Sequence, residues 1–131
     1  IVASHNDLAY HNIIIRDNKV YFIDFDYLKI DIRAKDISDF IIKTIKRFGF
    51  SVEMCDSIIC NYDKVSRLTK EELEIMYIYM MYPSDFTILS IEYYKKLKEW
   101  SYESYLYKFK NKLSYEKEKK ETLEYYKNNY L

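Results

Sequence analysis

Glycine and proline are almost absent from this sequence, because its 131 residues include only one of each. No linker rich in Pro, Gly or Ser and no internal repeat divides the chain. We therefore expect a single domain that is long enough to bury a core. Cysteine is scarce too, and we interpret Cys55 and Cys60 as free thiols packed in a helix, not as a disulfide or a metal site.

Net charge is also lacking, since Lys plus Arg and Asp plus Glu number 21 each. A nucleic-acid-binding domain needs a basic surplus to neutralise phosphates, so this balance argues against such a partner. No apolar run approaches the length that crosses a bilayer, and the N-terminus lacks the charged, apolar and small residues of a signal peptide in their usual order. The sequence therefore predicts binding to neither nucleic acid nor membrane.

Tyrosine is abundant, with 16 copies. One interpretation is oxidative cross-linking in an extracellular or coat layer. The other, which we favour, is a compositional drift toward Ile, Lys, Tyr and Asn. Hydrophobic residues make up 49% of the chain and charged residues 32%, which is typical of a folded globular protein and not of a disordered one.

Two short runs with β character lie near the start of the chain. Residues 13–15 and 20–23 are β-branched and aromatic, and residues 16–19 between them supply a turn. Together they predict a tight hairpin. The chain begins at Ile1 without an initiator methionine and enters a strand-like run at once, so we expect that its N-terminal part is missing.

After Asp36 the sequence has the periodicity of helices, so the predicted fold is mainly α with a small β-hairpin. The first helix should open at Asp36 and end before Gly49, because glycine has no Cβ and accepts the left-handed conformation that ends helices. A second helix should cover residues 52–63. The apolar face of the first helix consists of Ile37, Phe40, Ile41, Thr44, Ile45 and Phe48.

A third helix has the clearest start signal, a capping box at residues 69–72, in which a hydroxyl and a carboxylate satisfy backbone donors. Pro83 should stop this helix, and Ser84 should cap a fourth. A last helical stretch begins at residue 102. The expected apolar faces are Leu73, Met76, Tyr77, Met80 and Met81 on the third helix, Phe86, Tyr93, Tyr94, Leu97 and Trp100 on the fourth, and Tyr105, Leu106, Phe109 and Leu113 on the last.

The residues that carry chemistry lie around the hairpin. Residues 5–12 read HNDLAYHN, and residues 23–26 read IDFD. This order resembles the catalytic loop and the metal loop of phosphotransferases with a protein-kinase-like fold. Phosphoryl transfer needs a carboxylate to orient the acceptor hydroxyl and accept its proton, and oxygen ligands to hold magnesium against the nucleotide phosphates. The hairpin should present both loops at the same end.

The resemblance implies a role for each polar residue of these loops. Asp7 matches the catalytic base, and Asn12 and Asp24 match the magnesium ligands that also position the nucleotide. His5 matches the histidine that braces the catalytic loop. The implied cofactors are Mg²⁺ and ATP, and the implied fold is the C-terminal lobe of a protein-kinase-like fold.

Asp36, Asp26 and His11 are further polar residues in or near these loops. Asp36 matches an aspartate that hydrogen-bonds the backbone of the catalytic loop, and an ordinary carboxylate at a helix N-terminus is a compatible alternative. Asp26 is a weaker candidate, an acid near the metal. We interpret His11 as a loop residue, because no cysteine or second histidine stands at a spacing that would complete a zinc site.

Three departures from the family patterns narrow the assignment. Asn6 stands where these families often have glycine, so the loop backbone should differ slightly. Asp26 replaces the glycine of the protein-kinase Asp-Phe-Gly motif. No arginine precedes Asp7 and no Ala-Pro-Glu segment follows, which favours small-molecule kinases of the aminoglycoside phosphotransferase and choline kinase type over protein kinases.

A narrower resemblance is to the spore coat proteins of the CotS type. It implies a sporulating bacterium, a location in the mother-cell cytoplasm and then in the spore coat, and other coat proteins as partners. The segments that carry it are DLAYHN at 7–12, IDFDY at 23–27, DIR at 31–33, KDI at 35–37, and the later Tyr82-Pro83, Tyr93-Tyr94 and Trp100.

Two functions remain open at this point. The first is an ATP-dependent phosphotransferase that acts on a hydroxyl of a small molecule, and the second is a structural coat protein that keeps the kinase fold without turnover. In either case the resemblance places residues 1–131 in the C-terminal lobe and implies that the nucleotide-binding N-terminal lobe is missing. We therefore expect this chain to be inactive by itself.

Overall fold

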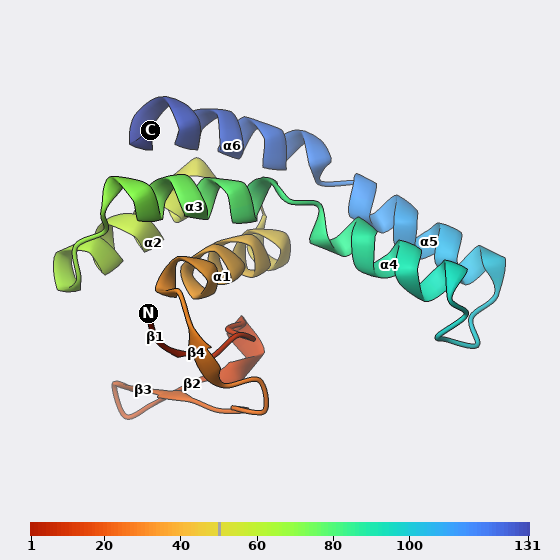
Figure 1. Cartoon of the computed structure of the whole chain (residues 1–131), viewed down its shortest axis with the longest axis horizontal. Coiled ribbons are helices and arrows are strands. Elements are labelled where there is room, and N and C mark those ends of the chain that lie inside the picture. Colours follow the sequence, from red (N-terminus) through yellow and green to blue (C-terminus); the bar gives the residue numbers. More distant parts are fainter. Residues whose placement is uncertain (50) are drawn as a thin grey trace.

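The computed structural model describes residues 1–49 and 51–131, and it is mostly helical with two small antiparallel sheets. In Figure 1 the strands gather at one end, α1 lies next to them, and α3 and then α6 follow on the far side of α1. The α4–α5 pair extends to one side. The prediction of a mainly helical chain with a small hairpin is confirmed.

The predicted hairpin is present as β2 (Ile13–Arg16) and β3 (Lys19–Phe22), which pair in antiparallel register. Asp17 and Asn18 form its two-residue turn, and both have positive φ, at 49° and 58°. These values fit the type I′ turn, whose twist matches that of the flanking strands, and Asn and Asp tolerate them better than most residues.

A second, unanticipated pairing joins β1 (Val2–Ser4) to β4 (Lys29–Asp31). β4 has only three residues, and the alternation of apolar and polar residues around it, from Leu28 to Ile32, is too short to indicate a strand or its partner. This pairing brings residues 2–4 close to the start of α1. The loop that follows β1 therefore lies next to the first turn of that helix.

Helix α1 (Arg33–Phe48) starts three residues before the predicted boundary, so Asp36 lies in its first turn and does not cap it. Ile37, Ile41 and Ile45 are buried as expected. Phe48 is exposed, contrary to the prediction, and its ring lies 5.9 Å from that of Tyr10. Gly49 follows with φ of +99°, a conformation that suits a residue without a Cβ.

Helices α2 (Val52–Val65) and α3 (Lys70–Met81) agree with the sequence pattern. The capping box of α3 forms in full between Thr69 and Glu72. Met80 is buried, but Met81, which is rotated about 100° further round the helix, is about half exposed. Both cysteines are free thiols in α2; Cys55 is buried, whereas Cys60 is exposed.

The C-terminal part contains α4 (Ser84–Tyr94), α5 (Tyr102–Leu113) and α6 (Glu116–Tyr130). Ser84 is the first residue of α4, so the predicted serine cap is wrong: Pro83 occupies the cap position and makes no side-chain bond. Because α4 ends at Tyr94, Leu97 and Trp100 lie in the following loop and not on its face.

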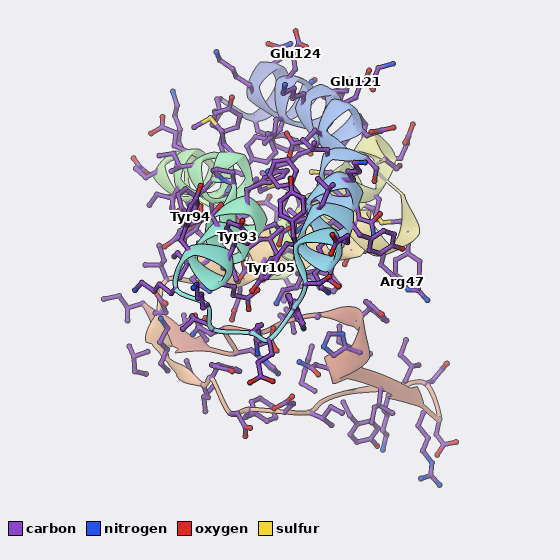
Figure 2. The ribbon with its side chains drawn as sticks, turned by 90° about the vertical axis from the view of Figure 1, so that its right-hand side faces the viewer. Arg47, Tyr93, Tyr94, Tyr105, Glu121 and Glu124 are labelled. Carbon is purple, nitrogen blue, oxygen red and sulfur yellow. The ribbon has the colours of Figure 1, made fainter. Side chains whose placement is uncertain are left out.

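The α4–α5 pair is held by aromatic contacts. The rings of Tyr93 and Tyr105 lie 5.1 Å apart, and both residues are visible at the end of the pair in Figure 2. Tyr105 is buried, whereas the other predicted face residues of α5 are partly exposed. No helix in the described part of the chain is both long and apolar enough to cross a membrane.

The main core lies where α1, α2, α3 and α6 meet. Tyr126 of α6 is fully buried there, and its hydroxyl donates to the Leu73 carbonyl at 2.9 Å. Arg33 joins α1 to α3 at one edge of this core. Its guanidinium donates to both carboxylate oxygens of Glu72 at 2.6 and 2.7 Å. The core is formed by Ala34, Ile37, Ile41, Ile45, Cys55, Ile59, Leu68, Met76, Met80 and Tyr126.

Truncation of Ile41 tests this core. Ile41 is fully buried, so Ile41→Ala should lower the free energy of unfolding by about 2–5 kcal/mol through lost burial and a residual cavity. Ile78→Ala is the matched control, because Ile78 is 59% exposed on the neighbouring helix. Chemical denaturation of both variants should separate them clearly, and equal midpoints would contradict the assigned face.

Candidate active site

The loop after β1 is anchored by the carboxylate of Asp36. The backbone N–H groups of His5 and Asn6 donate to the two carboxylate oxygens of Asp36 at 2.7 and 2.8 Å. Hydrogen bonds to an ionised group are short and strong, so they fix the orientation of two successive peptide units. The geometry agrees with the role that the family resemblance implies for Asp36, and its position in the first turn of α1 also suits the helix dipole.

Asn6 adopts the conformation for which glycine is usually needed, with φ of 61°. Its side-chain amide donates to the Ser4 carbonyl at 3.2 Å. Asparagine tolerates the left-handed region because its short polar side chain bonds locally. Asn6 therefore supplies at this position the positive φ that glycine adopts readily. That the loop backbone differs from that of glycine-containing relatives stays a prediction.

The carboxylate of Asp7 follows directly and contacts a lysine from a distant helix. Lys43 of α1 donates to Asp7 Oδ1 at 2.6 Å, although the two residues are 36 positions apart. This hydrogen bond is the main reason why the pKa of Asp7 is lowered; burial opposes it, and the charges of Lys43 and His11 add to it. Sequence reasoning missed Lys43, because nothing in a helical lysine indicates which loop it reaches.

Asn12 ends the 3₁₀ turn η1 (Tyr10–Asn12) and is buried. Its amide nitrogen donates to the backbone carbonyl of Asp7 at 2.9 Å and lies 3.4 Å from Asp7 Oδ2. Because the nitrogen is engaged in this way, the carbonyl oxygen of the Asn12 side chain is the atom that could bind a cation. Asp7 and Asn12 are thus brought together as the motif spacing predicts.

Asp24 is placed next to Asn12 through the backbone. The N–H of Ile23 donates to the Asn12 carbonyl at 3.0 Å, which extends the β2–β3 ladder up to the residue before Asp24. His5 holds the same segment: its Nε2 lies 2.9 Å from the Ile23 carbonyl, and its ring lies 4.9 Å from that of Phe25. His5 therefore contacts the residues on both sides of Asp24.

Asp24 and Asp26 both present exposed carboxylates, and Asp24 has a positive φ of 63°. Among the hydrogen bonds and ion pairs of residues 1–49 and 51–131, none joins Asp26 to Asp7, Asn12 or Asp24. A place for Asp26 beside a metal ion stays a prediction. His11 lies in η1 and is exposed, and its ring touches that of Tyr10 at 5.2 Å.

The oxygen donors of Asn12 and Asp24 fit a magnesium ion by their chemistry. Mg²⁺ prefers oxygen ligands and is commonly held by one or two protein groups together with substrate phosphates. Within the described residues, no three His, Cys, Asp or Glu side chains cluster to form a metal site.

The hairpin, the loop tied to α1 and the His-x-Asp-x-x-x-x-Asn arrangement define a kinase-like phosphotransferase lobe. A family model for choline/ethanolamine kinases matches residues 1–115, so the chain belongs to this family. It lies therefore within the superfamily of choline kinases and aminoglycoside phosphotransferases, whose choline kinase-like members generally use ATP and Mg²⁺. No curated protein and no solved structure matches the chain significantly.

The backbone conformation of Asn6 can be tested by substitution. Asn6→Gly should leave the free energy of unfolding within about 1 kcal/mol of the wild type, because glycine adopts positive φ without a steric cost. Asn6→Ala should destabilise the chain by roughly 1–2 kcal/mol, the cost of a left-handed residue with a Cβ. Thermal denaturation of the two variants measures the difference, and an alanine variant as stable as the glycine variant would contradict the assigned φ.

The contact between Lys43 and Asp7 predicts a pH effect. Asp7 has a lowered pKa in the folded state, so its contribution to stability is present above the unfolded value of 3.8 and is lost as the pH falls through the folded pKa. Lys43→Met should raise the pKa of Asp7. NMR titration of the Asp7 carboxyl carbon would measure this change. The control is Lys35→Met, which removes a lysine of α1 that pairs with Asp39. An unchanged Asp7 pKa in Lys43→Met would show that the ion pair is absent in solution.

Proposed function

We propose that this chain is the catalytic lobe of an ATP-dependent phosphotransferase that acts on a hydroxyl group of a small molecule. The observation that carries the proposal is the convergence of Asp7 and Asn12 in a loop that Asp36 anchors. The backbone bond of Ile23 to Asn12 adds the start of the metal loop to the same place. Membership of the choline/ethanolamine kinase family supports this reading.

In the proposed reaction Asp7 orients the acceptor hydroxyl and accepts its proton. The Asn12 amide holds the Asp7 backbone in place. The side-chain oxygens of Asn12 and Asp24 would hold magnesium. Magnesium and ATP, when bound, supply the phosphoryl group and neutralise its charge. Lys43 keeps the Asp7 carboxylate ionised and is displaced from it, or shares it, when the acceptor hydroxyl arrives.

A nucleotide-binding lobe is part of the proposal. The strands and the loop that follows them expose a run of large apolar side chains, although such side chains are usually covered. An N-terminal lobe packed against one face of the hairpin would cover the side chains that point to that face and would close the nucleotide site from the other side. The exposed residues are Ile14, Ile15, Val20, Tyr21, Phe22, Ile23, Phe25, Tyr27, Leu28 and Ile30.

We place the protein in the CotS-type branch of the superfamily on the segments given above. A role in the spore coat, a path from the mother-cell cytoplasm to the coat, and contacts with other coat proteins are parts of this proposal. The motifs at residues 7–12 and 23–27 and the pair Tyr93-Tyr94 support it. The matching family is named for choline and ethanolamine, two cationic amino alcohols, and compounds of this type are therefore the first acceptors to assay.

A structural coat protein without turnover is the second candidate, and one observation favours it. The ammonium of Lys43 occupies an oxygen of Asp7, which makes this carboxylate a weaker base. Phosphoryl transfer with a loose transition state depends more on positioning than on a strong base, so this contact does not exclude catalysis. The two candidates differ in whether mutation of Asp7 changes turnover.

The test uses the protein with both lobes, titrated calorimetrically with Mg-ATP and assayed for phosphate transfer to small alcohols and amino sugars. Asp24→Asn should abolish nucleotide binding that depends on magnesium. Asp7→Asn should preserve that binding and lower turnover by about 100-fold or more, because this residue acts on the acceptor. Asp17→Asn is the matched control, since it makes the same change in the hairpin turn.

Each outcome assigns the protein to one class. Loss of turnover in Asp7→Asn with retained binding supports the phosphotransferase. No Mg-ATP binding by the wild-type protein supports the structural coat protein. Turnover that Asp7→Asn leaves unchanged would show that the base is assigned to the wrong residue.

A further inference from the structure

The α4–α5 pair is an antiparallel helical hairpin that extends beyond the ends of α1, α3 and α6 (Figure 1). Helix α4 is apolar on all sides. Its Phe86 and Tyr93 contact aromatic rings of α5, whereas Ile88, Ile91 and Tyr94 on its other sides are exposed. A helix that is apolar all round is normally buried, so α4 has the character of a helix that a further element covers.

An apolar stripe also runs along the exposed side of α5. Its members recur at intervals of four, three and four residues, which is the spacing of a coiled-coil seam. Each of these side chains is more than a third exposed. The stripe consists of Tyr102, Leu106, Phe109 and Leu113. In coiled coils, a seam of this kind is buried against a second helix.

The stripe borders a groove of about 200 Å³ between the two helices. Leu89, Tyr93 and Tyr94 of α4 form one wall, and the first three members of the stripe form the other. Tyr105 lines the same groove, and its hydroxyl is buried without a hydrogen-bond partner among the described residues. A buried hydroxyl that lacks a partner is costly, so a polar group from a second molecule would stabilise it.

The charges beside the stripe complement an antiparallel copy of the same helix. Glu103 and Lys110 are seven residues apart, so they lie on the same flank of the stripe. Both are exposed, and none of the ion pairs of residues 1–49 and 51–131 involves either of them. On the other flank, which faces α4, Tyr105 is buried and the ammonium of Lys112 lies 3.5 Å from the carboxylate of Asp85.

We propose that two copies of this chain associate through the stripe and the groove, with their α5 helices antiparallel about a two-fold axis near residues 107 and 108. In this arrangement Leu106 lies opposite Phe109 of the second copy, and Tyr102 lies opposite Leu113. Glu103 lies beside Lys110 of the second copy, and the symmetry forms this ion pair twice. The two hairpins together form a four-helix arrangement in which α4 is covered.

This interface uses none of the residues of the candidate active site, so the proposal does not depend on phosphotransferase activity. Sedimentation equilibrium of the chain over an about hundredfold range of concentrations should show a reversible equilibrium between monomer and dimer. The protein with both lobes should show the same equilibrium. A chain that is monomeric at every concentration would overturn the proposal. A dimer of the chain alone, with a monomer when both lobes are present, would show that the other lobe covers this face and would also overturn it.

Two charge reversals locate the interface. Glu103→Lys and Lys110→Glu should each weaken self-association by about tenfold, because each brings like charges together on both sides of the two-fold axis. An equimolar mixture of E103K and K110E should associate about as tightly as the wild type, since opposite charges meet again. Glu124→Lys is the control, because Glu124 is exposed on α6, away from the α4–α5 pair (Figure 2). Equal dissociation constants for all variants and for the mixture would contradict the proposed interface.

A substitution in the stripe gives a test that does not depend on charge. Leu106→Gln should weaken self-association by about tenfold or more, because the two-fold axis makes the loss of apolar burial occur twice. Tyr107→Gln is the matched control, since Tyr107 is the next residue, is exposed and lies outside the stripe. Circular dichroism melting of dilute samples shows whether Leu106→Gln impairs folding, and in that case the mixture of charge variants decides. A folded Leu106→Gln variant that dimerises like the wild type would exclude this interface.

Discussion

The two hydrogen bonds from the loop backbone to Asp36 are the contact on which the candidate site depends. They join a segment with no regular structure to the first turn of a helix that is itself packed into the core through Ala34 and Ile37. Within this loop Ala9 is buried, but no regular backbone hydrogen bonds fix the peptide units of His5 and Asn6. The carboxylate supplies that constraint from outside the loop, and its two oxygens set the direction of two peptide units.

Helix α1 extends the same principle along its length. Arg33 in its first turn contacts Glu72 with two hydrogen bonds, which lower the pKa of that carboxyl to about 2. Lys43 in its middle reaches Asp7, and Lys46 reaches Asp85. Its apolar face fills the core, while its polar residues connect the strands, the start of α3 and the start of α4. One helix therefore connects the catalytic loop to the starts of α3 and α4.

Local signals in the sequence predicted the local structure well. The hairpin, its turn at Asp17 and Asn18, and the capping box at Thr69 all depend on residues that lie within a few positions of one another. The spacing from Asp7 to Asn12 likewise indicated that these side chains meet. The convergence of the two loops followed from the hairpin, which brings residues before and after it to the same end.

Contacts between distant segments could not be predicted in this way. The pairing of β4 with β1 joins segments about 27 residues apart, and the short alternation at residues 28–32 does not indicate which segment it pairs with. Lys43 and Lys46 look like ordinary polar residues of an amphipathic helix, and only the packing of α1 shows which carboxylates they reach. Ser84 fits a cap by residue type, but the conformation of Pro83 moves the helix start by one residue. Asp36 was identified by family resemblance and not by its own pattern.

The long sequence separation of the Asp36 contacts also determines the order in which the molecule can assemble. The β2–β3 hairpin closes across a two-residue turn and can form within microseconds, because all of its contacts are local. The N–H groups of His5 and Asn6 meet a carboxylate that is about 30 residues away, on a helix that gains most of its stability from packing. The catalytic loop therefore acquires its final conformation late in folding. A local opening that unfolds the first turn of α1 would break the two hydrogen bonds to Asp36 and disorder the loop, while the hairpin keeps its own backbone hydrogen bonds.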